Sequence, residues 1–259
     1  MTSKVLPALF IGHGSPMNLL AENPFTSDMV KLGTQLPVPK AIVVISAHWL
    51  TRGSFITSSD KPEQIYDFYG FPGSLYEYKY LAPGSAEIAG FICEMTGKDT
   101  IIMDGRRGID HAAWTILKHM RPEQDVPVLE ISLDIAREPH YHFDLGRKLA
   151  SLRKNNILVI GSGNIIHNLS EFNFDDNSKP FRWSEEFDLT IKTALENKDF
   201  DLLINYSKLG LAARRAIPFN DHYLPMLYVL GMIDNNENIK FVHESIQNGS
   251  ISMRSFIIG

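Results

Sequence analysis

The stretch Ala41-Ile-Val-Val-Ile-Ser-Ala-His48 decides how this sequence is expected to fold. It is a short apolar run rich in β-branched residues, and a polar turn with a histidine follows it directly. Such runs are typical of strands that are buried on both faces of a sheet. The pattern recurs along the chain, and we predict strands over Ala8 to Ile11, Ala41 to Ser46, Val126 to Leu133 and Ile157 to Ile160.

Segments with helical spacing of apolar residues lie between and after these runs. We predict helices over Ser85 to Met95, His111 to Met120, Phe143 to Leu152, Trp183 to Leu195 and Asp199 to Leu209, followed by a loop from Ile217 to Pro225. Alternating strands and helices favour an α/β fold, here three α/β/α layers around a central, largely parallel (mixed) sheet. The length of 259 residues is within the range of one domain, so we expect a single catalytic domain over 1–259.

Composition excludes several classes of protein. The hydrophobic fraction of 44% and the charged fraction of 21% are close to those of average globular proteins, so a disordered chain is excluded. The formal net charge is −5, and no run of Lys or Arg is present that would follow a phosphate backbone. We therefore expect no nucleic acid partner.

The N-terminal residues and the cysteine content indicate the compartment. The first apolar run is interrupted by His13-Gly14 before any cleavage-like site, which predicts a first strand and no signal peptide. No stretch approaches the roughly 18 apolar residues of a membrane-spanning helix. Cys93 is the only cysteine, so an internal disulfide framework and a multi-thiolate zinc site are excluded. We expect a cytoplasmic protein with no membrane partner; its oligomeric state is not predicted.

The segment Pro62 to Ala82 is dense in Tyr, Phe, Gly and Pro, which disfavours a long helix. Two interpretations stay open for it. It is either an ordered surface loop that packs on itself or an aromatic wall that stacks against a planar substrate.

Histidines follow the predicted strands more often than packing alone requires. His13 and His48 come directly after strands, His167 follows the turn after Ile160, and His222 lies in the loop that precedes Pro225. Parallel strands bring their carboxyl ends to one edge of the sheet, where ligands bind in open α/β sheets. Neutral imidazole is a common ligand of zinc and iron. These four residues are therefore either metal ligands or, taken singly, polar residues near the surface.

Asp110-His111 lies at the start of a predicted helix. The helix dipole disfavours the imidazolium there, so a neutral His111 is available to accept a proton from a hydroxyl or to donate a hydrogen bond. In the alternative, Asp110 caps the helix and His111 points to solvent. We assign the remaining histidines to the surface: His119, His140, His142 and His243.

The chain resembles the class III extradiol ring-cleaving dioxygenases, in the branch of the 4,5-DOPA extradiol dioxygenases. The resemblance covers essentially the whole length, and its motifs occur in the order of that branch. They are Gly12-His13-Gly14-Ser15-Pro16, Ser46-Ala47-His48-Trp49, Gly108-Ile109-Asp110-His111-Ala112-Ala113-Trp114, Gly161-Ser162-Gly163-Asn164 with His167-Asn168-Leu169, and Asp221-His222-Tyr223-Leu224-Pro225.

This resemblance implies one divalent metal ion held by His13, His48 and His222, with His167 as a fourth ligand or as the acid-base residue. His111 would line the substrate pocket. In this branch zinc is the metal usually found bound, whereas oxygen chemistry in the wider family uses ferrous iron. Two departures are notable: a glutamate is the third ligand outside this branch where His222 stands here, and Ala112 stands where the motif commonly has Gly.

The implied activity is extradiol opening of a catechol ring with incorporation of both atoms of O2. A metal with three protein ligands leaves room for a chelating catecholate and for oxygen. His167 is the first choice for the base that deprotonates the catechol, and His111 is the second. The implied substrate is L-DOPA, cleaved at the 4,5 position to a seco-DOPA that cyclises to betalamic acid. The alternatives are a non-catalytic metal-binding adaptor of the same fold and a zinc hydrolase.

Overall fold

The computed structural model describes residues 5–97, 99–175 and 178–259. Its strands are β1 (Ala8–Gly12), β2 (Ala41–Thr51), β3 (Phe55–Thr57), β4 (Ile102–Asp104), β5 (Val128–Asp134), β6 (Ile157–Gly163), β7 (Ile239–His243), β8 (Ile246–Gln247), β9 (Ile251–Ser252) and β10 (Ser255–Ile258). Its helices are α1 (Pro24–Gln35), α2 (Gly73–Glu77), α3 (Ala86–Thr96), α4 (His111–Met120), α5 (Pro139–Leu149), α6 (Arg182–Glu196), α7 (Phe200–Ile204), α8 (Leu211–Ala216) and α9 (Leu224–Gly231).

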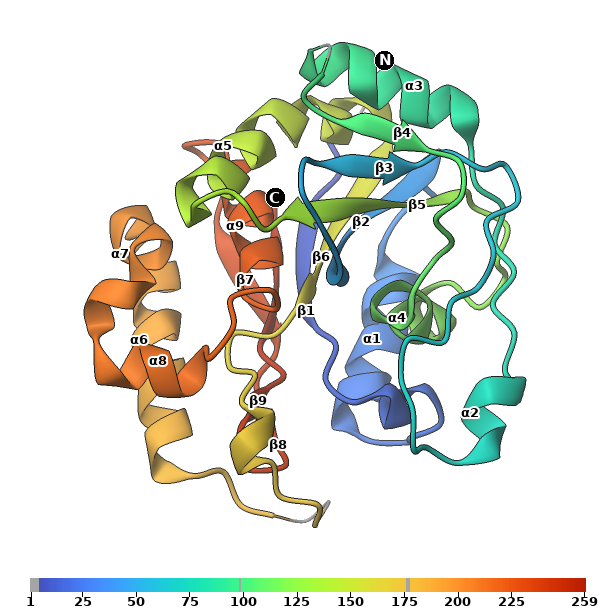
Figure 1. The fold of residues 1–259 in the computed structure, drawn as a ribbon. Helices are drawn as coiled ribbons and strands as arrows, with labels where there is room; N and C mark the ends of the chain where they lie inside the picture. The colour runs from blue at the N-terminus through green and yellow to red at the C-terminus, as the bar shows by residue number, and fades with distance from the viewer. Residues whose placement is uncertain (1–4, 98, 176–177) are drawn as a thin grey trace.

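A mixed sheet of eight strands in the order β4-β3-β5-β2-β6-β1-β10-β7 forms the centre of the molecule (Figure 1). Its middle strands β5, β2, β6 and β1 pair in parallel. The pairs β1–β10, β10–β7 and β3–β5 are antiparallel. The parallel core therefore brings the carboxyl ends of β1, β2 and β6 to the same edge.

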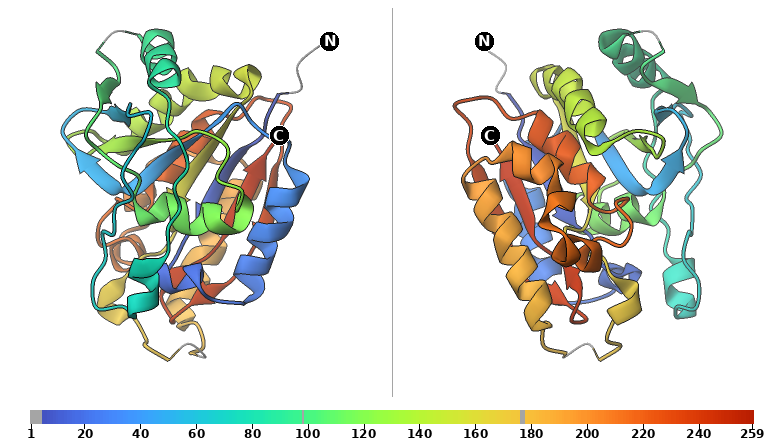
Figure 2. Two further views of the ribbon diagram at one scale, coloured as in Figure 1. Left: turned by 90° about the vertical axis from the view of Figure 1, so that its right-hand side faces the viewer. Right: turned by 60° about the vertical axis from the view of Figure 1, so that its left-hand side comes forward.

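Alternation along the strands supplies two hydrophobic cores, one on each face of the sheet. Along β2, Val43 and Ile45 belong to the core beneath α5 and α9, whereas Ile42 and Val44 belong to the core beneath α1 and α4. Successive side chains of a strand point to opposite faces, so a strand that is apolar throughout must be covered on both sides. Figure 2 shows α1 and α4 on one side of the sheet and α5, α6 and α9 on the other. The predicted α/β/α fold is confirmed.

Most predicted elements are present, with shifted ends. Helix α4 has the predicted bounds, and α3 begins after Ser85, whose side chain accepts a hydrogen bond from the Ile88 N–H. Helix α5 begins at Pro139, before the predicted start, because proline is well suited to the first helical position. The predicted helix over 199–209 is instead α7 and the 3-10 helix Tyr206–Leu209, which share Asn205 as a cap residue.

Sequence patterns did not identify several elements. Helix α1, the short strands β3 and β4, and the C-terminal strands were not predicted, and α9 begins inside the predicted loop over 217–225. The aromatic segment 62–82 is largely without regular structure, as expected, except for the short helix α2. The edge strands are short, so their sequence signal is weak.

Three histidines assigned to the surface are in fact buried. His119 Nε2–H donates to the Asn18 carbonyl oxygen at 2.8 Å, His142 contacts the Tyr228 hydroxyl, and His243 contacts Asp28. Each of these imidazoles has a hydrogen-bond partner, which offsets the cost of burying a polar ring. The spacing of apolar residues in the sequence does not reveal such partners. Only His140 is exposed, as predicted. Across the described ranges, no helix combines the length and the apolar character needed to cross a bilayer.

Candidate metal centre

The ends of β1 and β2 place the first two histidines of the site. His13 follows Gly12, the last residue of β1, and its backbone N–H donates to the Gly163 carbonyl at 3.1 Å. His48 lies inside β2, which continues to Thr51, so the prediction that the strand ends at Ser46 was wrong. The pairing of β2 with β5 shifts register between Ile45 and Leu50. Such irregularities re-aim side chains and are common beside active sites.

Glycines in β6 allow the third histidine to approach. A Cβ atom on Gly163 would lie 2.1 Å from the His222 carbonyl oxygen, and one on Gly161 would lie 2.5 Å from that of Pro225. The His222 carbonyl also accepts the Asn164 N–H at 2.9 Å. Because no side chain intervenes, the start of α9 packs directly on β6, and His222 is brought to the ends of β1 and β2.

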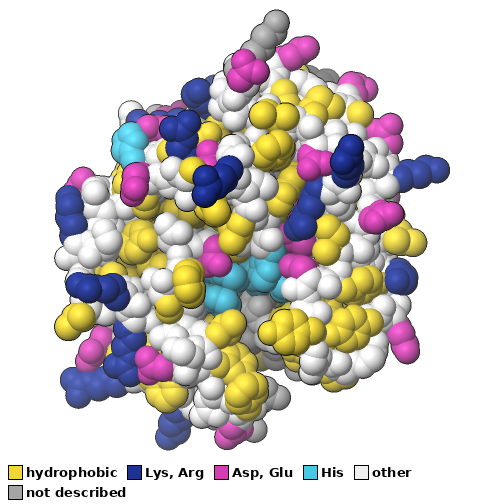
Figure 3. Space-filling model, viewed as in Figure 1, with side chains coloured by type: hydrophobic (Ala, Val, Ile, Leu, Met, Phe, Trp, Pro, Cys, Tyr) yellow, Lys and Arg dark blue, Asp and Glu magenta, His cyan; other side chains and the backbone are white. Residues whose placement is uncertain are grey.

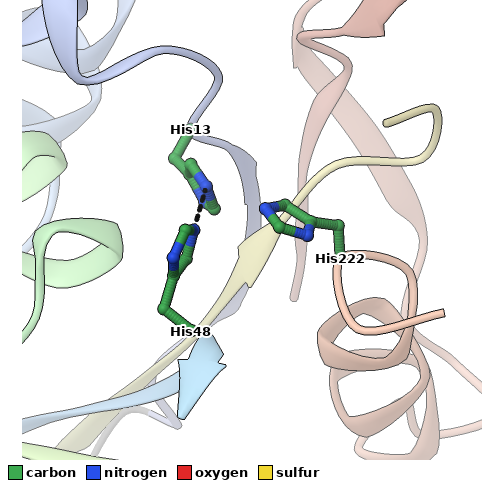
Figure 4. Close-up of side chains that lie close together, drawn as sticks. All are labelled: His13, His48 and His222. Atoms are coloured by element: carbon green, nitrogen blue, oxygen red, sulfur yellow. Dashed lines mark hydrogen bonds between the residues drawn. The ribbon is translucent and has the colours of Figure 1, made fainter. Parts of the chain in front are cut away.

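The three imidazoles converge on one point. The Nε2 atoms of His13 and His48 are 3.3 Å apart, and Figure 4 shows His222 directed toward them from the opposite side. One ligand atom from each ring lies within 4.8 Å of the other two. Two nitrogen ligands of a tetrahedral zinc ion, each at about 2.0–2.1 Å, are separated by about 3.3 Å. The spacing of His13 and His48 therefore fits a shared metal ion.

The hydrogen bonds of His13 fix its tautomer. The Ser162 hydroxyl donates its single hydrogen to the Ala112 carbonyl at 2.6 Å. The 3.0 Å contact between Ser162 Oγ and His13 Nδ1 must then be donated by the imidazole. A neutral His13 consequently carries its hydrogen on Nδ1, and its Nε2 lone pair faces the centre of the site.

Two carboxylates fix the other two ligands in the same way. Asp67 Oδ2 lies 3.0 Å from His48 Nδ1, and Asp221 Oδ1 lies 3.0 Å from His222 Nδ1. A carboxylate only accepts, so each Nδ1 donates, and in the neutral ring Nε2 is left as an acceptor. This arrangement of a carboxylate behind a metal-binding histidine orients the ring and raises its basicity.

Charge and burial keep most of the cluster neutral. Burial, together with the neighbouring histidines, holds the pKa of His13 and that of His222 well below the usual value. Burial alone would also lower the pKa of His48, but the carboxylates of Asp67, Asp110 and Asp221 outweigh it and raise that pKa. The pKa of Asp67 is lowered, against its own burial, by hydrogen bonds from His111 and His48. Neutral imidazoles beside ionised carboxylates are the state that binds metal.

One further observation supports a metal ion at this position. His222 Nε2 is buried and has no hydrogen-bond partner among the residues that the structure describes. Such an atom is costly unless a ligand satisfies it. A cation in contact with the three Nε2 atoms satisfies it and also removes the repulsion between the lone pairs of His13 and His48. The donor set thus fits one divalent metal ion.

His167 and His111 flank this centre without joining the three-histidine group. The rings of His167 and His222 are stacked, with centroids 3.5 Å apart and planes at 6°. The metal-ligand geometry groups His167 with Asp221 and His222, and not with His13 and His48. The lone pair of an imidazole nitrogen lies in the ring plane, so two rings stacked in parallel planes do not readily direct their lone pairs at one ion. Burial lowers the pKa of His167 to about 4.

His111 lies on the other side of the cluster, with its ring centroid 4.1 Å from that of His48. Asp110 does cap α4, because its side chain accepts the Ala112 N–H. His111 does not point to solvent, however: it is buried, and its Nδ1 lies 2.8 Å from Asp67 Oδ1. The helix-capping half of the alternative is confirmed and the solvent-facing half is wrong.

Asp67 is a residue of this site to which the sequence assigned no role; Ser162 and Asp221, which stand in motifs of the family, are two others. Asp67 lies within the aromatic segment 62–82, whose composition predicts a surface loop or an aromatic wall and does not indicate a polar group at the metal site. The available signal was an acidic residue placed between two aromatic ones, Tyr66 and Phe68. Figure 3 shows the result on the surface: histidine side chains gather in a hollow, with acidic and hydrophobic side chains around them.

The chain is similar to aromatic ring-opening dioxygenases over most of its length. Residues 27–257 match the family model described as the catalytic LigB subunit of aromatic ring-opening dioxygenase. A 4,5-DOPA dioxygenase extradiol from Escherichia coli K12 is 41% identical over 100% of this chain and 97% of the relative. One from Beta vulgaris is 34% identical over 95% and 94%. The crystal structure of an uncharacterized Escherichia coli K12 protein superposes with a TM-score of 0.86 at 38% identity, covering 98% of this chain and 100% of that one.

Proposed function

Because this chain belongs to the LigB family of extradiol aromatic ring-opening dioxygenases, we propose that it cleaves a catechol of the L-DOPA type with O2 at a metal centre formed by His13, His48 and His222. The observation that carries the proposal is the convergence of three imidazoles whose Nδ1 atoms are all engaged. We further propose that residues 1–259 form one catalytic domain and that the enzyme works in the cytoplasm.

Ferrous iron, when bound, would hold the catecholate and O2 together and carry the electron transfer that lets triplet O2 react with a spin-paired catechol. Zinc cannot change oxidation state and would support binding without this step. We therefore propose Fe(II) as the catalytic metal and zinc as a metal that the same ligands also retain.

His167 is the proposed proton acceptor for the catechol. A pKa of about 4 keeps its imidazole neutral at physiological pH, so it is able to take a hydroxyl proton. The negative charge of Asp221 acts against burial and raises the pKa of His167. The same charge would stabilise His167 once it has accepted the proton. His111 is the second candidate, since its Nδ1–H is donated to Asp67 and its Nε2 is left free to accept.

The aromatic segment supports a planar substrate. Phe68 packs edge-on to His111 with ring centroids 5.4 Å apart. Phe68 also contacts Phe71 and Tyr76, so the segment packs on itself as well as on the site. Both interpretations of this segment therefore have support, and we propose that Phe68 forms a wall of the substrate pocket.

The proposed reaction inserts both oxygen atoms of O2 and opens the ring beside the diol. The relatives named 4,5-DOPA dioxygenase extradiol support L-DOPA as an accepted substrate. Cleavage at the 4,5 position would give a seco-DOPA that cyclises to betalamic acid.

The test is anaerobic reconstitution with ferrous iron, followed by L-DOPA and air. We expect O2 uptake and a yellow product in equal amounts, and neither with the zinc-loaded protein. Absence of uptake with iron for L-DOPA and for simple catechols would contradict the proposal. Ester hydrolysis by the zinc form alone would instead indicate a hydrolase.

The metal ligands are tested separately. His48→Ala is expected to lose bound metal after dialysis, whereas His119→Ala and the exposed His140→Ala retain it. Metal content per chain, measured by atomic emission, decides the outcome. Equal retention by His48→Ala and His140→Ala would show that the ion lies elsewhere.

A further inference from the structure

Asp67 connects two histidines of the site through separate oxygens. Its Oδ1 accepts from Nδ1 of His111 at 2.8 Å and from the backbone N–H of the same residue at 3.1 Å. Its Oδ2 lies 3.0 Å from His48 Nδ1. The residue lies at the surface, but its side chain is turned inward and only 19% of it is exposed.

We propose that Asp67 is a positioning residue that selects the metal-binding tautomer of His48 and, by the same contacts, docks the aromatic segment 62–82 on the metal centre. This inference rests on the proposed role of His48 as a ligand. It makes metal retention depend on a loop residue that does not itself touch the metal.

The selection follows from hydrogen-bond chemistry. A neutral imidazole has one N–H, and only a carboxylate accepts at both oxygens. Facing Asp67, His48 keeps its hydrogen on Nδ1, which leaves the Nε2 lone pair directed at His13. The opposite tautomer would place a hydrogen on Nε2, where it blocks coordination.

The docking follows from the neighbours of Asp67 in the chain. The Ile65 carbonyl accepts the Trp114 indole N–H at 3.0 Å, and Phe68 packs edge-on to the His111 ring. These contacts hold the segment on either side of Asp67 against helix α4. The Asp67 carboxylate thus links the segment to His48 of β2. The position of Phe68 and the tautomer of His48 therefore both depend on Asp67.

Asp67→Asn separates this proposal from a purely structural role. The amide has one acceptor oxygen, and His111 presents two donors to it, the Nδ1–H and the backbone N–H. The amide NH2 is then left facing His48 Nδ1. An NH2 group requires an acceptor there, so the hydrogen of His48 moves to Nε2. The fold is preserved while one ligand is lost.

Asp28→Asn is the matched control. Asp28 Oδ2 accepts from Nδ1 of another buried histidine, His243, at 2.9 Å. That histidine pairs through its other nitrogen with Ser245 and takes no part in the proposed centre. The same chemical change behind an unrelated histidine should leave metal affinity unaltered.

The experiment is zinc competition against a chelator on the full chain, with imidazole tautomers read by long-range proton–nitrogen NMR on the metal-free protein. We expect about 10- to 100-fold weaker zinc binding by Asp67→Asn, the usual effect of losing such a partner, and less than twofold change for Asp28→Asn. Recorded at a pH at which His48 is neutral, the NMR spectra should show Nδ1–H for His48 in the wild type and Nε2–H in Asp67→Asn.

The outcomes distinguish this inference from the proposed metal site. If His48→Ala loses zinc but Asp67→Asn binds it as the wild type does, tautomer selection by Asp67 is wrong and the metal site stands. If His48→Ala binds zinc normally, the metal site itself is wrong. An Nε2–H tautomer of His48 in the wild-type protein would overturn the inference even if Asp67→Asn does not fold.

Discussion

Three neutral imidazoles leave the full charge of a divalent ion uncompensated, and the carboxylates that would balance it lie one hydrogen bond further out. Asp67 stands behind His48 and Asp221 stands behind His222, whereas the neutral hydroxyl of Ser162 stands behind His13. Two of the three imidazoles therefore donate a hydrogen bond to a carboxylate, which makes their other nitrogen a stronger metal ligand. The resemblance implies an altered charge balance at His222, and the carboxylates behind His48 and His222 would offset it in the proposed centre.

Glu130 is a further carboxyl group near the site, and its protonation state can be tested through protein stability. Glu130 is fully buried in β5 and accepts the Asp110 N–H at 2.8 Å. Burial, and then the charge of Asp110, raise the pKa of Glu130 well above 4.5. A carboxyl whose pKa is higher in the folded state stabilises the fold below its unfolded pKa. This stabilisation is lost as pH rises through the folded pKa.

We predict that Glu130→Gln removes this loss. From pH 4.5 upward the wild type should lose up to about 1.4 kcal/mol of unfolding free energy per pH unit relative to the variant, until the folded pKa is reached. Urea unfolding of both proteins at pH 5, 6 and 7 measures the difference. A constant difference across this range would show that Glu130 is ionised in the fold.

At the scale of elements, the site depends on how closely α9 approaches β6. The glycines of β6 remove the side chains that would separate them, and the segment that carries His222 packs in their place. Helix α4 lies on the opposite face of the sheet and supplies His111 from its first residue. His111 at the start of α4 and His222 just before α9 thus come from opposite faces of the sheet and lie at the same edge.

Gly163→Ala is predicted to displace His222. The added Cβ would meet the His222 carbonyl oxygen at 2.1 Å, so the backbone must move. We expect a loss of about 1–3 kcal/mol in stability, typical of overpacking, and at least about tenfold weaker zinc binding.

Gly90→Ala is the control for that substitution. Gly90 lies inside α3, and a Cβ atom there meets nothing within 4 Å. Alanine should stabilise this helix by about 0.5–1 kcal/mol and leave zinc affinity unchanged. Unaltered zinc affinity in Gly163→Ala would show that the approach of α9 to β6 does not set the position of His222.

At the scale of the whole molecule, the proposed ligands come from three distant parts of the chain: the end of β1, the irregular part of β2 and the connection from α8 to α9. A metal ion that joins them binds the folded state and not the unfolded chain. Such a ligand adds to stability in proportion to the logarithm of its free concentration.

Zinc is therefore predicted to stabilise the wild type by about 2.7 kcal/mol when its free concentration is one hundred times its Kd. For a chain of this size the gain corresponds to a rise in Tm of about 5–10 °C. Thermal scans with zinc and with excess chelator measure it. His48→Ala should show the same Tm in both, and a zinc-dependent rise in that variant would contradict the assignment.

The sequence by itself determined the layers of the fold and the choice of histidines. Strands that are apolar on both faces, such as Ala41 to Ser46, must be covered by helices on both sides, so the α/β/α architecture follows from local pattern. The sequence also identifies the histidines of the site, because they follow predicted strands or stand in motifs of the family: His13, His48, His111, His167 and His222.

Only the tertiary structure decided which of these histidines converge and what stands behind them. Asp67 lies in a segment without periodicity, and its carboxylate contacts residues that are 19 and 44 positions away in the sequence. The stacking of His167 on His222 and the burial of His119, His142 and His243 likewise depend on distant partners. Local pattern records which face of an element is apolar, whereas the partner of a buried polar atom is set by how the elements pack.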